Sequence, residues 1–192
     1  MKRIINFIEN NTSGKRVLAL FILTNVVYIF MLAVTIPKTM RFANGMKLMD
    51  MMPTGYDLNY VSTLFSALGE NGRLTYLTNQ IPVDMIYPLL FGLSYCLLLG
   101  YLLDKLNKLN SQYIYLCLLP IIAGIADYLE NIGIISLLKN YPELTEITVQ
   151  TTNSFSLIKS ISTSAFFIVL IVTLLVLGIQ FMKRNKSNAN HI

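Results

Sequence analysis

Four apolar runs constrain this chain more than any other feature, because each is long enough to cross a lipid bilayer as a helix. They extend over about residues 17–37, 82–103, 113–138 and 155–182. A hydrocarbon core about 30 Å thick takes roughly 20 helical residues at 1.5 Å per residue. Because lipid offers the backbone no hydrogen-bond partners, such segments fold as helices. We therefore expect an all-α integral membrane four-helix bundle, with residues 1–192 forming a single membrane domain.

The composition and the placement of the basic residues predict how this bundle is oriented. Only 13% of the residues are charged, whereas soluble domains have about a quarter. Nine basic and two acidic residues flank the spans on one side, which gives that side a net charge of +7 and leaves −2 for the other, the whole chain carrying +5. The positive-inside rule then predicts a multi-pass protein of the cell (inner or plasma) membrane with both termini in the cytoplasm. Anionic lipid accounts for the basic balance, so no nucleic-acid partner is predicted.

The segment between the first and second spans, residues 38–81, is then extracytoplasmic, and its pattern predicts an amphipathic helix. Thr54 or Asp57 could cap the start of this helix, and Gly69 could end it. Five of the nine methionines fall within residues 40–52. They indicate an apolar surface for packing or membrane contact, with a methionine metal site as the less favoured alternative. The apolar residues at helical spacing are Leu58, Val61, Leu64, Phe65 and Leu68.

The cysteines and the single histidine indicate neither redox chemistry nor a zinc site. Cys96 and Cys117 lie inside predicted spans and form no C-x-x-C pair, so we interpret both as small core hydrophobes. His191 lies in a polar tail, which argues against a histidine-dependent zinc site or catalytic triad. The sequence assigns no metal site and leaves the cofactor unknown.

Ionisable residues inside the spans are the candidates for function. An ionisable group costs at least about 2.5 kcal/mol at the centre of a bilayer, so it persists mainly where it has a partner or a task. In the third span Asp127, Glu130 and Asn131 occupy positions i, i+3 and i+4 and share one face of the helix. We expect that face to point into the bundle, with Lys159 or Arg73 neutralising Asp127 or Glu130.

Other polar residues are expected at the same level as this acidic face, which predicts a pocket open to the outer side. The second span begins with Asp84 and Tyr87, and Lys159 lies in the first turns of the fourth. The candidate catalytic residues are Asp127, Glu130 and Asp84. The candidate ligand-binding residues are Arg73, Tyr76, Tyr87, Asn131 and Lys159.

These residues support three functional interpretations. In the first, the pocket binds or processes a membrane lipid or other small amphiphile, with the carboxyl groups as an acid and base pair or as holders of a cation, and with Arg73 and Lys159 contacting an anionic group. In the second, the same carboxyl groups bind protons or cations in an accessory or oligomeric transport component. In the third, they form an ion-pair network in a structural scaffold. The sequence decides neither enzymatic activity nor oligomeric state.

Three short motifs carry a resemblance to a known group of proteins. They are Gly72-Arg-x-x-Tyr76, Asp84-x-x-Tyr-Pro88 and Asp127-x-x-Glu-Asn131. Together they resemble a group of small four-span prokaryotic membrane proteins, over roughly residues 56–138. The resemblance implies no mechanism. It implies that the positions to test are Arg73, Tyr76, Asp84, Asp127, Glu130 and Asn131.

Overall fold

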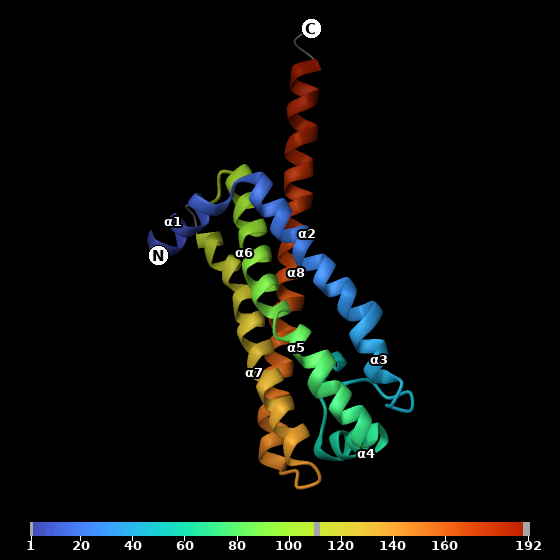
Figure 1. The fold of residues 1–192 in the computed structure, drawn as a ribbon. Coiled ribbons are helices and arrows are strands. Elements are labelled where there is room, and N and C mark those ends of the chain that lie inside the picture. The colour runs from blue at the N-terminus through green and yellow to red at the C-terminus, as the bar shows by residue number, and fades with distance from the viewer. Residues whose placement is uncertain (1, 110–111, 190–192) are drawn as a thin grey trace.

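The computed structural model describes residues 2–109 and 112–189. Helices make up 85% of the structure, and no strand occurs in the described ranges, which confirms the all-α class. Four helical segments are long and apolar enough to cross a membrane, as expected for a multi-pass membrane protein (Figure 1). These segments are Gly14–Met40, Leu58–Lys105, Gln112–Asn140 and Glu146–Lys183.

The first half of the chain forms the first two spans. The elements are α1 (Lys2–Asn11), α2 (Gly14–Phe30), the π-helical turn η1 (Met31–Thr35), α3 (Ile36–Met40) and the short 3₁₀ turn η2 (Met49–Met51). They are followed by α4 (Leu58–Thr75), the π-helical turn η3 (Tyr76–Gln80), α5 (Ile81–Asp84) and α6 (Tyr87–Lys105).

The second half forms the third and fourth spans. It consists of the 3₁₀ segment η4 (Gln112–Leu118), α7 (Leu119–Asn140) and α8 (Glu146–Ala189). The fourth helix therefore begins well before residue 155, where hydropathy had placed the start of the span. The backbone N–H of Thr148 donates to Thr145 Oγ1 at 3.3 Å. This side-chain cap starts the helix among polar residues, which a count of apolar residues does not detect.

The amphipathic helix predicted between the first two spans is α4. Its predicted N-cap is confirmed, since Asp57 Oδ1 accepts a hydrogen bond from the backbone N–H of Tyr60 at 2.7 Å. Gly69 breaks the helix with φ 61° and ψ −174°, but the chain resumes helical geometry beyond it and continues through η3 and α5 into α6. The predicted end at Gly69 is therefore a kink, and the second span is joined to α4 without a loop.

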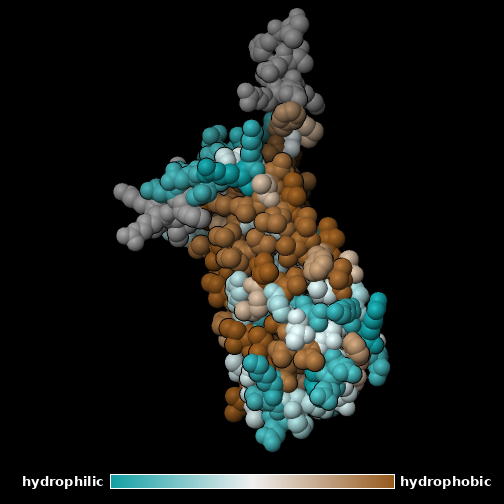
Figure 2. Space-filling view, viewed as in Figure 1, coloured by the Kyte–Doolittle hydropathy of each residue, from teal (hydrophilic) through white to brown (hydrophobic). Residues whose placement is uncertain are grey.

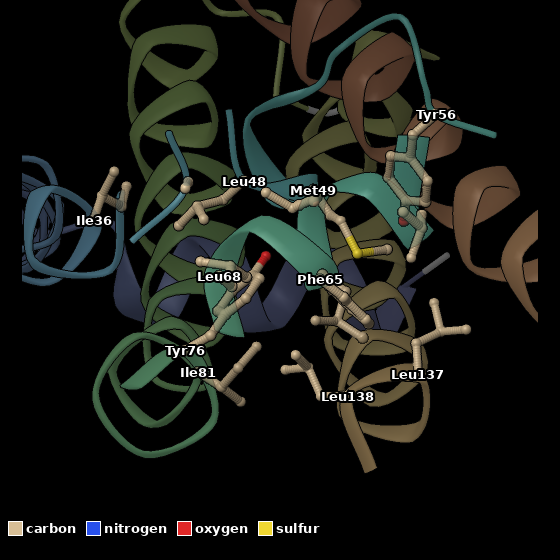
Figure 3. Close-up of a cluster of buried hydrophobic side chains, with 14 of the residues drawn as sticks. Ile36, Leu48, Met49, Tyr56, Phe65, Leu68, Tyr76, Ile81, Leu137 and Leu138 are labelled. Carbon is tan, nitrogen blue, oxygen red and sulfur yellow. The ribbon is translucent and has the colours of Figure 1, made fainter. Parts of the chain in front are cut away.

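The apolar face of α4 packs on a core at this end of the molecule (Figure 3). In that view Leu48 and Met49 lie on one side of the cluster, and Leu137 and Leu138 of α7 lie on the other, with Phe65 of α4 between them. Val61, Leu64, Phe65 and Leu68 are all buried. Met49 belongs to this core, and the other methionines of residues 40–52 pack against it, as the packing interpretation predicted.

Pro37 and Pro82 lie inside nearly continuous helix, shortly after a π-helical turn. Proline lacks a backbone N–H, and its ring clashes with the carbonyl group four residues earlier. Each proline is preceded by a π-helical turn, in which the backbone N–H of Ile36, for example, donates to the carbonyl of Met31 five residues earlier. The wider turn accommodates the proline while the chain stays helical.

Helices α6 and α7 form the centre of the bundle. Helix α2 packs mainly on α6, and α8 packs mainly on α7 (Figure 1). The buried side of α8, which packs on α7 and at Phe166 also on α6, follows three- and four-residue spacing, the pattern of a coiled-coil seam. Its buried members are Val149, Thr152, Ser156, Ser162, Phe166, Leu170 and Thr173.

The molecular surface has the form of a membrane protein. Figure 2 shows a continuous apolar band, with a hydrophilic region over the N-terminal helices at one end and a mixed hydrophilic lobe around α4 at the other. The two cysteines are buried and unbonded, in keeping with core packing. His191 lies outside the described residues.

The contact between α6 and α7 leads to a prediction about Gly124. A Cβ atom placed on Gly124 would lie 2.7 Å from the carbonyl oxygen of Pro88, which is backbone and has little freedom to move. We expect Gly124→Val to lower the free energy of unfolding by about 1–3 kcal/mol through overpacking. Gly178→Val on α8 is the control, since nothing lies within 4 Å of a Cβ there. Equal unfolding temperatures for the two variants in the same detergent would contradict the prediction.

Candidate functional site

Lys159 of α8 joins the two carboxylates of α7. Its Nζ lies 3.2 Å from Asp127 Oδ1 and also forms an ion pair with Glu130 Oε2. Both acids are buried, with 6% of Asp127 and none of Glu130 exposed. The structure therefore confirms the predicted neutralisation and identifies Lys159 as the cation that provides it.

The pairing depends on where Lys159 lies along the α7–α8 seam. It occupies the seam position between Ser156 and Ser162, both of which are small and buried. Small neighbours let the two helices approach closely and leave room for the long lysine side chain to lie along the seam. One turn of α7 presents Asp127 and Glu130 on the facing side, three residues apart.

Tyr56, from the segment before α4, reaches the same acids. Its hydroxyl group donates to Glu130 Oε1 at 3.5 Å, and its backbone N–H donates to Asn153 Oδ1 of α8 at 2.9 Å. Burial, reinforced by the nearby Glu130 carboxylate, raises the pKa of the Tyr56 hydroxyl above its ordinary value. The hydroxyl therefore stays protonated and remains a donor.

Asp84 and Asn131 form the neighbouring part of the site. Asn131 Nδ2 donates to the backbone carbonyl of Asp84 at 3.3 Å, which ties α7 to the end of α5. Only 3% of Asp84 and none of Asn131 is exposed. Asp84 Oδ2 and Asn131 Oδ1 nevertheless have no hydrogen-bond partner in the part of the chain that the structure describes. Buried oxygen atoms in native proteins rarely lack a partner.

Asp50 is a site residue that the sequence did not reveal. Its two carboxylate oxygens accept hydrogen bonds from the Tyr76 hydroxyl at 2.9 Å and from Gln80 Nε2 at 3.0 Å. Gln80 Oε1 in turn accepts a hydrogen bond from Thr35 Oγ1. This chain of contacts joins the two π-helical turns to η2. The one available signal was a single carboxyl group in the methionine-rich stretch, next to Met49 and Met51.

A cavity of about 430 Å³ lies among these groups. Its charged lining residues are Asp50, Asp84, Asp127 and Lys159, and its aromatic ones are Tyr28, Tyr87 and Phe91. Met31, Leu32, Ile36 and Met51 add apolar surface, and Ser160, Thr163 and Ser164 add hydroxyl groups. The lining residues come from α2, η1, α3, η2, α5, α6, α7 and α8, together with Pro53 of the segment before α4.

The structure brings most of the predicted site residues to this cavity. Asp84, Tyr87, Asp127 and Lys159 line it. Three more contact a lining residue: Glu130 contacts Lys159, Asn131 contacts Asp84, and Tyr76 contacts Asp50.

Arg73 is the predicted residue that the structure does not bring to the cavity. Its NH1 donates to the backbone carbonyl of Phe65 at 2.8 Å, and its guanidinium group lies 4.4 Å from the centre of the Tyr141 ring. Arg73 therefore braces the kinked helix α4 against the turn after α7, and it is not placed to contact a ligand of the cavity.

The potential metal ligands among the described residues do not form a recognisable metal centre. Within residues 2–109 and 112–189, no three carboxylate, cysteine or histidine side chains converge closely enough to hold a metal ion. Comparisons with protein-family models, with curated proteins and with solved structures find no match to this chain. The function of the site is therefore argued from its geometry and chemistry alone.

Proposed function

We propose that this chain is a cell-membrane protein, with both termini in the cytoplasm, whose cavity binds a lipid or other small amphiphile. The observation that carries the proposal is that two lining residues are also exposed on the outside of the bundle, and we take this place as the mouth of the cavity. Tyr28 and Leu32 both line the cavity, yet they remain 41% and 45% exposed on the outer surface of α2 and η1. That surface belongs to the apolar band, so a molecule dissolved in the bilayer can enter sideways.

The lining of the cavity suits a molecule with one polar and one apolar end. Carboxyl and hydroxyl groups line the cavity at Asp84, Asp127 and Ser160. Apolar lining comes from Met31, which is buried, and from Leu32, which is exposed on the outside of η1. A volume of about 430 Å³ falls within the range of roughly 300–1,000 Å³ usual for small-molecule sites. A polar head group would contact the carboxyl and hydroxyl groups of the lining, and a hydrocarbon chain would contact the apolar lining and extend into the bilayer.

Binding is better supported than catalysis. An acid and base pair needs carboxyl groups that are free to exchange protons with a substrate. Asp127 and Glu130 are instead both held by Lys159. Asp84 is the lining carboxyl group with an oxygen that lacks a partner among the described residues, and it serves best as a contact for the head group.

Native mass spectrometry of protein released gently from its membrane tests the proposal. We expect one lipid or amphiphile per chain in the wild type and its loss in Ser160→Phe, which fills the cavity and leaves the ion pairs intact. Ser154→Phe, on an exposed face of the same helix, is the matched control and should retain the bound molecule. A spectrum without bound amphiphile in the wild type, or equal retention in both variants, would reject the proposal.

A second candidate function is a proton or cation site in an oligomeric transport component. It is favoured by the unpartnered oxygen of Asp84, which could take up a proton. Four spans without an inverted repeat make a self-contained carrier a poor fit, so this function requires additional copies or a partner. Chemical crosslinking in intact membranes tests it, and a strictly monomeric chain would count against it.

A further inference from the structure

The charge balance around the cavity is strongly acidic. Asp50, Asp84 and Asp127 line the cavity together with Lys159, and Glu130 pairs with Lys159 beside them. Lys159 is already paired with two of them. It is therefore not available to an anionic ligand, and an anion entering the cavity would meet the remaining carboxylates at close range.

The unpartnered polar atoms beside the cavity point to a ligand that donates hydrogen bonds. Asp84 lines the cavity, and its Oδ2 is buried without a partner among the described residues. The unpartnered atom of the neighbouring Asn131 is likewise an oxygen acceptor. A buried acceptor left without a donor is destabilising, and more so if it is charged. A ligand with N–H groups would remove that cost, whereas a phosphate or carboxylate would add acceptors.

Aromatic rings form part of the same lining. Tyr28 and Tyr87 are stacked with ring centres 5.4 Å apart, and Phe91 lies 5.7 Å from Tyr87. All three line the cavity with Asp84. The faces of aromatic rings attract cations, and an aromatic wall next to a carboxylate is a favourable environment for an ammonium group.

We infer that the cavity recognises the ammonium group of an amine-bearing amphiphile. Asp84 provides the counter-charge, and the rings of Tyr28, Tyr87 and Phe91 surround the ammonium group. The hydrocarbon chain extends past Leu32 into the bilayer. This inference rests on the proposed function, because it names the chemical class of the molecule that the cavity binds. It also replaces the anionic group expected from the sequence, since Lys159 is neutralised and Arg73 lies elsewhere.

Three probes with the same twelve-carbon chain test the inference, namely dodecylamine, dodecanol and dodecanoate. Each is titrated into the protein in phosphatidylcholine nanodiscs, with the unfolding temperature as the readout. We expect dodecylamine to bind at least about tenfold more tightly than the other two, since a hydrogen bond to a charged group contributes roughly 1.5–3 kcal/mol. Asp84→Asn should abolish that preference. Asp57→Asn, an exposed acid at the start of α4, is the control for surface charge and should retain it.

The outcomes separate this inference from the proposed function. Binding of all three probes with equal affinity would overturn the ammonium assignment and leave an amphiphile site. Binding of none would overturn both. Butylamine distinguishes an amphiphilic amine from a water-soluble one. If butylamine binds as tightly as dodecylamine, the site takes a water-soluble amine. The amphiphile proposal then fails, and the ammonium assignment stands.

A second variant keeps the inference testable if Asp84→Asn does not fold. Tyr28 is 41% exposed at the mouth of the cavity, so Tyr28→Leu should disturb packing little. A cation–π contact contributes about 0.5–1 kcal/mol at such a site. We therefore expect Tyr28→Leu to weaken dodecylamine binding about threefold and to leave dodecanol binding unchanged. An equal effect on both probes would overturn the inference.

Discussion

Lys159→Met is expected to lower the free energy of unfolding by about 3–5 kcal/mol, because it leaves two buried carboxyl groups without their cation. Asp127 and Glu130 are 6% and 0% exposed, so bulk solvent does little to replace the lost ammonium group. The two acids would then repel one another within one turn of α7. Thermal or denaturant unfolding in a mild detergent measures the loss. A variant as stable as the wild type would show that the pairs contribute little.

The control is a variant in which all three charges are removed together. Lys159→Met combined with Asp127→Asn and Glu130→Gln keeps similar side-chain volumes and leaves no charge in this network. Replacing a whole buried ion network by groups of similar size is often neutral or stabilising. We therefore expect the triple variant to recover most of the stability lost by Lys159→Met. If it recovers stability and also retains the bound amphiphile, the network is a scaffold, and ligand recognition belongs to Asp84 and the aromatic residues.

The parts of the site that could be predicted from sequence are those set by local helical geometry. Asp127 and Glu130 share a face because they are three residues apart, and a face that carries two acids in an apolar span must point inward. Lys159 was a predictable partner because a basic residue inside an apolar span also needs a partner of opposite charge. Arg73 was the other candidate. The ion pairs of Lys159 confirm this reasoning.

Helical geometry alone did not predict the position of Arg73. The break at Gly69 ends the first part of α4, and the carbonyl groups of a helix's last turn then need other donors. The Arg73 side chain reaches back and supplies one to Phe65. Sequence indicated a helix end near Gly69, but it did not show that the chain would turn and continue as helix, which brings Arg73 within reach of that carbonyl.

Asp50 could not be placed from sequence because all its contacts are distant along the chain. Its hydrogen bonds from Tyr76 and Gln80 join residues 26 and 30 positions apart. They form only because α4 folds back beside η2 and because η3 rotates Tyr76 and Gln80 toward the same point. Helical periodicity describes contacts within one element, so it gives no information about a carboxyl group in an irregular segment.

Asp50→Ala is the second change expected to have a large effect. Tyr76 and Gln80 are both fully buried, and each donates a hydrogen bond to this carboxylate. A hydrogen bond to a charged group contributes about 1.5–3 kcal/mol, so the loss of both would cost roughly 3–6 kcal/mol if the two contributions add. The free energy of unfolding measures this loss. Asp50→Asn, which keeps one acceptor oxygen, should lose less.

Asp57→Ala is the matched control, because Asp57 lies seven residues after Asp50 and caps α4 from an exposed position. Loss of an N-cap costs about 1 kcal/mol. Asp50→Ala should therefore be clearly the more damaging of the two, and an equal loss would contradict a structural role for Asp50.

The contact between Gln80 and Thr35 adds a sharper test of how Asp50 acts. Thr35→Val removes the hydroxyl group that donates to Gln80. If Asp50 and Thr35 both act by holding Gln80 between the two π-helical turns, each change disturbs the same side chain. The double variant should then lose less stability than the sum of the two single losses, as neighbours in one network do. Additive losses would mean that the first and second spans are held together at this level by packing, and that Asp50 serves mainly the cavity.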